Sequence, residues 1–174
     1  MKQAAYSTSQ KALHWVSVIL IGIMAFTGLA YVYEWADESI IIGHQIAGQV
    51  LIVVLLSRIA ARVRKGGRVR DQHALWERVL SSTVHIGLYA AMIAFVVTGY
   101  VAASALRDNV LLIPLDIGFA RSDLGETFLE THYALKWVLA GLLFLHIAGA
   151  IKHVLIDRDE TFSSIWPSKR EDIS

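Results

Sequence analysis

Two histidines, His132 and His146, lie fourteen residues apart in an apolar C-terminal segment of the chain. In an α-helix, fourteen residues come within about 40° of four full turns and rise about 21 Å. Both imidazoles therefore leave one face of a helix at two different depths. Two more histidines, His14 and His44, lie at the ends of earlier apolar segments. Because imidazole is a common metal ligand, this layout indicates two metal centres stacked across a membrane.

The composition indicates that the solvent around the helices is lipid. Hydrophobic residues make up 55% of the 174 positions, and the mean hydropathy is +0.51. A span of the hydrocarbon layer takes about 20 helical residues. Four stretches are long enough, at residues 13–33, 40–61, 79–105 and 133–156. We therefore expect an all-α membrane protein, a four-transmembrane-helix bundle that forms a single domain over residues 1–174. The first stretch exceeds the apolar core of a secretion signal, so we expect it to be retained.

Charge placement predicts the orientation, because basic residues collect on the cytoplasmic side of a membrane. Basic residues precede the first helix, follow the second and follow the fourth: Lys2, Lys11, Arg62, Arg64, Lys65, Arg68, Arg70, Lys152, Arg158, Lys169 and Arg170. The opposite connections are acidic, with Glu34, Asp37, Glu38, Asp108, Asp116, Asp123, Glu126 and Glu130. Both termini are therefore expected in the cytoplasm.

Depth then pairs the four histidines. With the first helix running outward and the second and fourth running inward, His44 and His132 share the outer level. His146 lies about 21 Å deeper than His132, near the inner level of His14. The chain has no cysteine, which excludes disulfides, cysteine-ligated iron–sulfur clusters and covalently attached c-type haem.

The facing imidazoles could hold zinc, copper or haem iron. Structural zinc prefers four ligands, often with cysteine, whereas two opposed histidines fit the two faces of a haem. A haem held from both faces has no open coordination position, which favours electron transfer over oxygen binding. Glycines near the histidines would let helices or a flat ring approach closely, at Gly22, Gly28, Gly48, Gly141 and Gly149. Four unrelated histidines bonded to helix carbonyls are the alternative to metal binding.

Two cations lie near the predicted ligands. Arg58 follows His44 by fourteen residues, where it could bind inner haem propionates or extend to the lipid headgroups. Lys136 lies one turn after His132, where the same two readings apply at the outer level. His153 is a rival to His146 as inner ligand, since it lies seven residues later on a similar face. His85 is a second spare histidine, a candidate for a carbonyl contact or a proton path.

The connection at residues 106–131 is long, and Arg121-Ser122-Asp123 followed by Glu126 is typical of a short helix start. We expect this segment to lie over the outer site as a docking surface or lid. The five tryptophans lie mostly near helix ends, where they are expected to anchor the helices at the headgroups.

The chain resembles the bacterial cytochrome b561 family, small four-helix dihaem membrane cytochromes that oxidise quinol. The likeness covers nearly the whole chain. It is carried by His14-Trp15, by the run His44-Gln45-Ile46-Ala47-Gly48 leading to Arg58 and Arg62, and by His132 with His146. It implies two b-type haems, an inner one between His14 and His146 and an outer one between His44 and His132, with Arg58 and Lys136 as further haem-binding residues.

The resemblance also implies a multi-pass protein of the bacterial inner membrane, in or near the respiratory chain. Its activity would be transmembrane electron transfer with the quinone pool, as an oxidoreductase acting on quinone or quinol, with superoxide as electron donor in one branch. The expected partners are membrane lipid, quinone, a periplasmic redox protein or dehydrogenase subunit, and a second copy in a homodimer, without nucleic acid.

Two other functions are consistent with the residues. The chain could be the haem-carrying membrane anchor of a dehydrogenase or hydrogenase complex, whose docked enzyme supplies specificity. It could also be a transporter or structural helix bundle without haem, which predicts a colourless protein.

Overall fold

The computed structural model describes residues 6–65, 74–105, 123–159 and 161–166. Within these ranges the chain forms helices and no strands. The long helices are α1 (Thr8–Val32), α2 (Ile40–Lys65), α3 (Leu75–Ala105) and α4 (Asp123–Lys152). A π-helical segment, His153–Asp157, continues α4, and the short α5 (Thr161–Ile165) follows. Each of the four long helices is long and apolar enough to cross a membrane, which confirms the predicted fold class.

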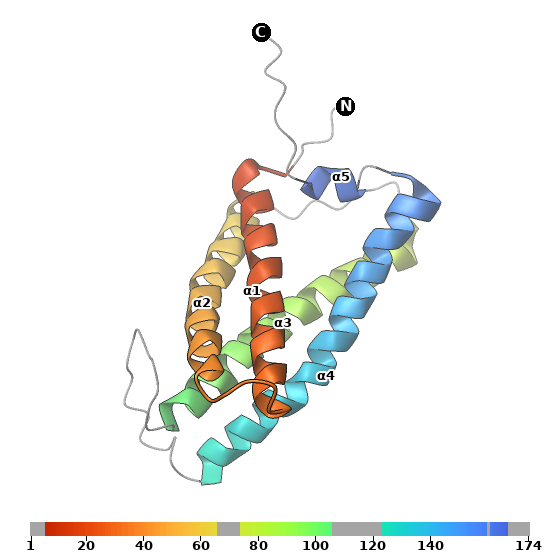
Figure 1. The fold of residues 1–174 in the computed structure, drawn as a ribbon. Helices are drawn as coiled ribbons and strands as arrows, with labels where there is room; N and C mark the ends of the chain where they lie inside the picture. The colour runs from red at the N-terminus through yellow and green to blue at the C-terminus, as the bar shows by residue number, and fades with distance from the viewer. Residues whose placement is uncertain (1–5, 66–73, 106–122, 160, 167–174) are drawn as a thin grey trace.

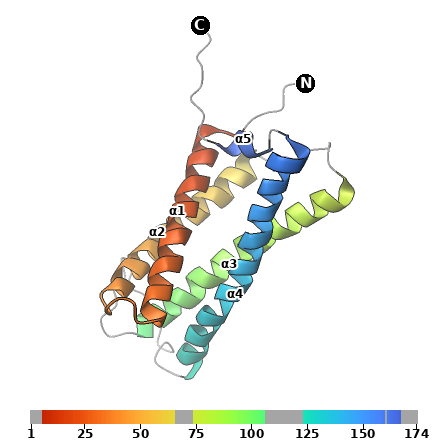
Figure 2. The ribbon, with the colours of Figure 1, turned by 45° about the vertical axis from the view of Figure 1, so that its right-hand side comes forward.

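The long helices associate as two antiparallel pairs. α1 packs along α2 and α3 packs along α4, while α2 and α3 join the pairs (Figures 1 and 2). α5 lies across one end of the bundle, between the ends of α1 and α4 (Figure 1). There Lys11 Nζ donates to the Trp166 carbonyl at 3.0 Å, and Trp15 Nε1 donates to the Ile165 carbonyl at 3.1 Å. The two ends of the described chain therefore lie at one end of the bundle, hereafter the α5 end.

Local sequence explains where α1 begins and ends. Ser7 caps its N-terminus, with the hydroxyl accepting from Gln10 N while the Gln10 side chain accepts from Ser7 N. At the other end Glu34 adopts φ 55°, in the left-handed region. Trp35 N then donates to the Ala30 carbonyl at 2.9 Å and Glu34 N to the Tyr31 carbonyl at 3.3 Å. This pair of bonds is a Schellman motif, and it turns the chain toward α2.

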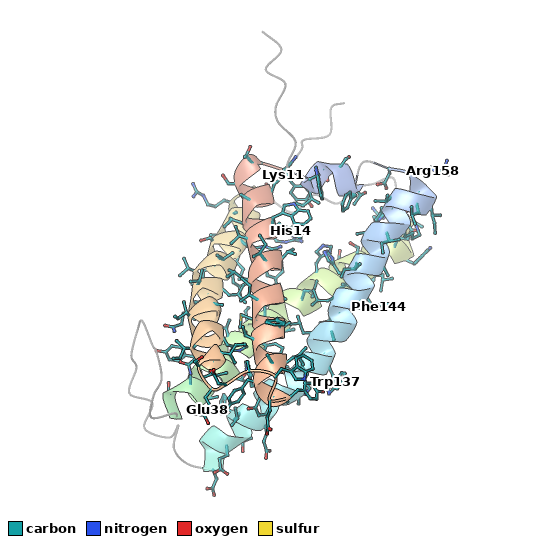
Figure 3. The ribbon with its side chains drawn as sticks, viewed as in Figure 1. Lys11, His14, Glu38, Trp137, Phe144 and Arg158 are labelled. Atoms are coloured by element: carbon teal, nitrogen blue, oxygen red, sulfur yellow. The ribbon has the colours of Figure 1, made fainter. Side chains whose placement is uncertain are left out.

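The connection between α1 and α2 is acidic and hydrogen-bonded. Ser39 N donates to Asp37 Oδ1 at 2.9 Å. Hydrogen bonds from the Ser39 side chain and backbone hold the pKa of the Asp37 carboxyl below its ordinary value. This end of the bundle, where Glu38 also lies (Figure 3), therefore carries fixed negative charge at neutral pH.

The apolar core lies between the four helices and not around them. It consists of Leu55 from α2 with Val84, Leu88 and Met92 from α3, packed against half-buried side chains of all four helices. Most of the remaining apolar side chains are exposed, and in α4 only Gly125 is buried. An apolar outer surface is what a bundle needs when its surroundings are lipid.

The structure corrects the predicted bounds of all four helices. α1 begins at Thr8 and not at residue 13, and α2 ends at Lys65 and not at residue 61. α4 begins at Asp123 and not near residue 133, and α3 begins at Leu75 and not at residue 79. The helix start predicted around Asp123 is therefore the start of α4 itself, which is continuous from there to His132 and beyond. Glu126 and Glu130 lie on this helix and not in a connecting loop. Residues 123–131 of the predicted lid are helical, so they are not part of a connecting loop.

Candidate metal centres in the helix bundle

His44 of α2 and His132 of α4 face each other across the bundle. Their ring centres are 6.2 Å apart and their planes cross at 84°. A metal ion between two imidazoles lies about 2 Å from each ligating nitrogen, which sets the ring centres about 6 Å apart. The observed spacing fits an iron atom held between the two rings.

The hydrogen bonds of His44 identify its ligating nitrogen. Nδ1 lies 3.1 Å from the Met24 carbonyl oxygen and 3.1 Å from Thr27 Oγ1, both on α1. A carbonyl only accepts, and the Thr27 hydroxyl already donates to the Ile23 carbonyl at 2.8 Å. Nδ1 is therefore the protonated nitrogen, and the lone pair of the neutral ring lies on Nε2. A partner that fixes the tautomer in this way is typical of metal-ligating histidines.

His132 repeats the arrangement against α3. Its Nδ1 lies 3.1 Å from Thr98 Oγ1, and the ring also bonds the backbone of Phe95. The Thr98 hydroxyl donates to the Ala94 carbonyl at 2.7 Å, so its oxygen accepts from the ring. The Phe95 side chain meets the imidazole edge-on at 4.8 Å. Nε2 of His132 is therefore also the nitrogen with the lone pair.

A glycine adjoins each of these two rings. A Cβ built at Gly28 would lie 3.2 Å from His44 Cε1, and one built at Gly99 would lie 2.8 Å from His132 Cε1. The rings thus occupy space that any larger residue would fill. The prediction that glycines allow close approach is confirmed at Gly28. Gly99 was not among the predicted glycines, while Gly22, Gly141 and Gly149 have no neighbouring atom within 4 Å of a built Cβ.

His14 of α1 and His146 of α4 form a second pair nearer the α5 end, where Figure 3 labels His14. Their ring centres are 6.3 Å apart and their planes cross at 57°. The spacing again fits a metal between two imidazoles. Arg58 Nη2 lies 3.4 Å from His14 Nδ1, and Trp15 packs edge-on against the same ring at 5.7 Å.

His85 of α3 lies beside this pair. Its ring centre is 5.0 Å from that of His146, which is closer than two ligands on opposite sides of one iron atom would lie. Its Nδ1 donates to the Ser81 carbonyl at 2.6 Å, four residues earlier in the helix. The predicted carbonyl contact of His85 is therefore present. His85 is a neighbour of the His14–His146 pair and not one of the two rings spaced for a metal.

The two predicted propionate cations have aromatic partners. The Arg58 guanidinium lies 5.5 Å from the centre of the Tyr89 ring, and that of Arg62 lies 6.0 Å from it. Lys136 Nζ lies 5.5 Å from the centre of the Trp137 ring. Arg58 is thus close to the His14–His146 pair, whereas the described contact of Lys136 is with a neighbour on its own helix.

His153, the rival inner ligand, belongs to an ionic cluster at the end of α4. Its Nδ1 lies 3.0 Å from Asp157 Oδ2 and 3.1 Å from Asp159 Oδ2. Lys152 Nζ bonds Asp157 at 2.7 Å and Glu77 of α3 at 2.9 Å. The cluster therefore ties α3 to the end of α4.

Some residues named from the sequence lie outside the described ranges. They are Lys2, Arg68, Arg70, Asp108, Asp116, Arg121, Ser122, Lys169 and Arg170, together with residues 106–122 of the predicted lid. Sequence reasoning missed Thr27, Thr98 and Gly99. The dipeptide Thr-Gly, which occurs at 27–28 and again at 98–99, is the signal that could have found them.

Comparison with known proteins assigns the family. The family model described as prokaryotic cytochrome b561 matches residues 5–168. The chain is 24% identical over 177 aligned residues to cytochrome b561 homolog 2 of Escherichia coli (strain K12), covering 96% of this chain and 94% of that protein. No solved structure gives a significant match. The chain therefore belongs to the prokaryotic cytochrome b561 family, whose members are multi-pass inner-membrane proteins that bind b-type haem for electron transport.

Proposed function

We propose that the protein binds two b-type haems, one between His44 and His132 and one between His14 and His146. The observation that carries this proposal is the spacing of the ring centres, 6.2 Å and 6.3 Å, in two pairs that come from separate helices. The tautomers of His44 and His132 support the first site, because each presents the Nε2 lone pair. Arg58 beside His14 supplies a cation for haem propionates at the second site.

The two sites lie at different depths of one membrane. His132 and His146 share α4, and fourteen residues of helix separate them by about 21 Å. Haems bound at the two levels supply reversible one-electron carriers. Leu55, Val84, Leu88 and Met92 pack together in the bundle interior and exclude water from it. An arrangement of this kind lets electrons cross the hydrocarbon layer without opening a path for ions.

The α5 end is proposed to face the cytoplasm. Arg58, Arg62 and Arg64 lie in the last turns of α2 at this end, and Lys152 lies in the last turn of α4. The connection between α1 and α2 at the other end is acidic, with Asp37 held ionised by Ser39. Basic residues prefer the cytoplasmic side, so His14 and His146 form the inner site.

We assign the quinone pool as electron partner, with quinol oxidised or quinone reduced beside one of the sites. A quinone reaction needs a group that takes or gives protons. His85 is the best-placed candidate at the α5 end, since its Nδ1 is committed to the Ser81 carbonyl and the lone pair lies on Nε2. It adjoins His146 at 5.0 Å.

The first test is the haem content of the protein purified in mild detergent. Oxidised and dithionite-reduced spectra should show two low-spin b haems per chain. His44→Ala, His132→Ala, His14→Ala and His146→Ala should each remove about one haem, while His153→Ala, the matched control in the π-helical segment that continues α4, should remove none. A colourless wild-type protein contradicts the proposal and leaves a transporter or scaffold.

Quinone exchange is tested separately, by adding a short-chain quinol to the oxidised protein and following haem reduction at the α band. Reduction by the isolated chain supports direct exchange. If the haems stay oxidised until a copurifying dehydrogenase or hydrogenase subunit is restored, the protein is instead the membrane anchor of that complex.

A further inference from the structure

The α1–α2 pair and the α3–α4 pair share a short repeat that is not evident from the sequence as a whole. Thr27-Gly28 in α1 and Thr98-Gly99 in α3 are the same dipeptide, 71 positions apart. Each threonine oxygen lies 3.1 Å from Nδ1 of the histidine on the paired helix, and each glycine adjoins Cε1 of that histidine. His44 and His132 are therefore held by equivalent residues of equivalent helices.

The repeat extends along the helices at one spacing. His14 precedes Gly28 by fourteen residues, and His85 precedes Gly99 by fourteen. On the paired helices, Arg58 follows His44 by fourteen residues, as His146 follows His132. The structure brings the matching positions together in both pairs, because Arg58 contacts His14 and His146 adjoins His85. The Thr-Gly dipeptides thus occupy the same place in two copies of one helix pair.

The hydroxyls of Thr27 and Thr98 are oriented by their own helices. Each donates to the carbonyl four residues earlier, at 2.8 Å for Thr27 and 2.7 Å for Thr98. Both side chains are buried, in residues with exposed fractions of 9% and 6%. With the hydroxyl proton committed, each oxygen presents a lone pair toward the paired helix, where it accepts the Nδ1 proton of the imidazole.

We propose that Thr27 and Thr98 are positioning residues that fix the tautomer and orientation of His44 and His132 and set the reduction potential of the haem between them. The inference rests on the proposed function, since it requires a haem at this pair. An Nδ1–H hydrogen bond strengthens imidazole as a ligand and so favours the oxidised iron. Loss of the threonine oxygen leaves only the backbone partner of each ring, Met24 for His44 and Phe95 for His132, so it weakens the Nδ1–H bond and raises the potential of this one haem.

The contrast between serine and alanine isolates the hydroxyl oxygen. Thr27→Ser and Thr27→Ala differ by one oxygen atom, as do Thr98→Ser and Thr98→Ala. Thr27→Val and Thr98→Val keep the shape and remove the hydroxyl. Thr127→Ala on α4 is the control, because the hydroxyl of the exposed Thr127 makes the same bond to the carbonyl four residues earlier, at 3.0 Å.

The readouts are a redox titration followed at the α band and the low-spin EPR spectrum of the oxidised protein. In the alanine and valine variants at either threonine, the potential and the largest g value of one haem should change, and the potential should rise. The other haem should keep its wild-type values. The serine variants and Thr127→Ala should match wild type. Thr27→Ala and Thr98→Ala combined should shift the same haem further.

The outcomes separate this inference from the proposed function. A colourless wild-type protein overturns both. Two haems whose potentials and g values are the same in the serine and alanine variants overturn only the role of the threonines. If the valine variants do not fold, the serine and alanine pairs carry the comparison. Selective loss of one haem in Thr98→Ala, with recovery in Thr98→Ser, supports the inference.

Discussion

A Cβ atom at Gly99 would lie 2.8 Å from Cε1 and 3.2 Å from Nδ1 of His132. Real Cβ contacts are essentially never shorter than 3.0 Å, so a residue larger than glycine at this position must displace the imidazole. The same atom at Gly28 would meet His44 Cε1 at 3.2 Å, which is tight without being prohibitive. A Cβ atom is therefore less well tolerated at Gly99 than at Gly28, although the two positions are otherwise equivalent.

Gly99→Ala should lower the haem content of the His44–His132 site, and Gly28→Ala should lower it less. The expected loss for Gly99→Ala is roughly ten-fold in haem affinity, the lower end of the range for disturbed support of a metal ligand. The measurement is the haem-to-protein ratio after purification and after competition with apomyoglobin. Gly141→Ala on α4 serves as the control, because its Cβ would meet no atom within 4 Å. Equal haem retention in all three variants contradicts this account.

The two proposed haems should differ in EPR anisotropy. The ring planes cross at 84° in the His44–His132 pair and at 57° in the His14–His146 pair. The angle between the two imidazole planes determines the energy difference between two of the iron d orbitals. Perpendicular planes make this difference small, which increases the spread of g values. The more anisotropic low-spin signal should therefore vanish in His132→Ala and persist in His14→Ala. The reverse assignment would show that haem binding reorients the rings.

His85→Ala should leave two haems in place. The ring centres of His85 and His146 are 5.0 Å apart, too close for a metal between them, whereas His14 lies at 6.3 Å from His146. Haem content by pyridine haemochrome should stay near two per chain, while the rate of reduction by quinol should fall if His85 carries protons. Loss of one haem in His85→Ala with retention in His14→Ala would make His85 the ligand.

Lys152→Met should lower the melting temperature of the purified protein. Lys152 joins Glu77 at the start of α3 to Asp157 beyond α4, so its removal leaves both carboxylates without this partner. Glu77→Gln should produce a smaller drop, and the two changes together should be less than additive because they break one shared bond. Arg64→Met, at the end of α2, is the control. Fully additive effects would show that the bond between Lys152 and Glu77 contributes nothing.

Glu34→Gly should stabilise the protein by about 1 kcal/mol or less, because glycine adopts the left-handed conformation without the Cβ penalty. Glu34 has φ 55° in the Schellman motif that ends α1, and its side chain is exposed. The measurement is thermal unfolding followed by intrinsic fluorescence. Glu38→Gly, in the same connection, is expected to stabilise nothing. A lower melting temperature in Glu34→Gly would show that the carboxylate itself matters.

The membrane helices and the histidine pairs are largely predictable from the sequence, because apolar length and a spacing of fourteen residues are properties of single helices. The prediction that the fourth helix starts near residue 133 is wrong for a related reason. Residues 123–132 include Asp123, Glu126 and Glu130, which interrupt the apolar run of the membrane span. Acidic residues in the first turn stabilise a helix N-terminus. The residues that shorten the apolar run therefore also favour the start of the helix.

The residues that hold the histidines in place are harder to predict from the sequence. Thr27 bonds His44 across two helices, and the bond depends on how those helices are rotated against each other. A lone threonine in an apolar helix most often bonds its own backbone, and Thr27 does this as well. Only the repetition of Thr-Gly at 98–99 marks the residue in the sequence, and this short signal gains meaning when the structure shows that each threonine contacts a histidine.

The hydrogen bonds between the first and last described segments affect the order in which the protein can assemble during synthesis. Trp15 precedes Ile165, whose carbonyl it bonds, by 150 residues, so α1 leaves the ribosome long before its partner is synthesised. The Trp166 carbonyl bonded by Lys11 is equally late. Insertion of α1 and α2 can thus precede these bonds, and the surroundings of His14 are completed only after α5 has been synthesised. A chain truncated before α5 would lack the bonds that Lys11 and Trp15 make beside His14.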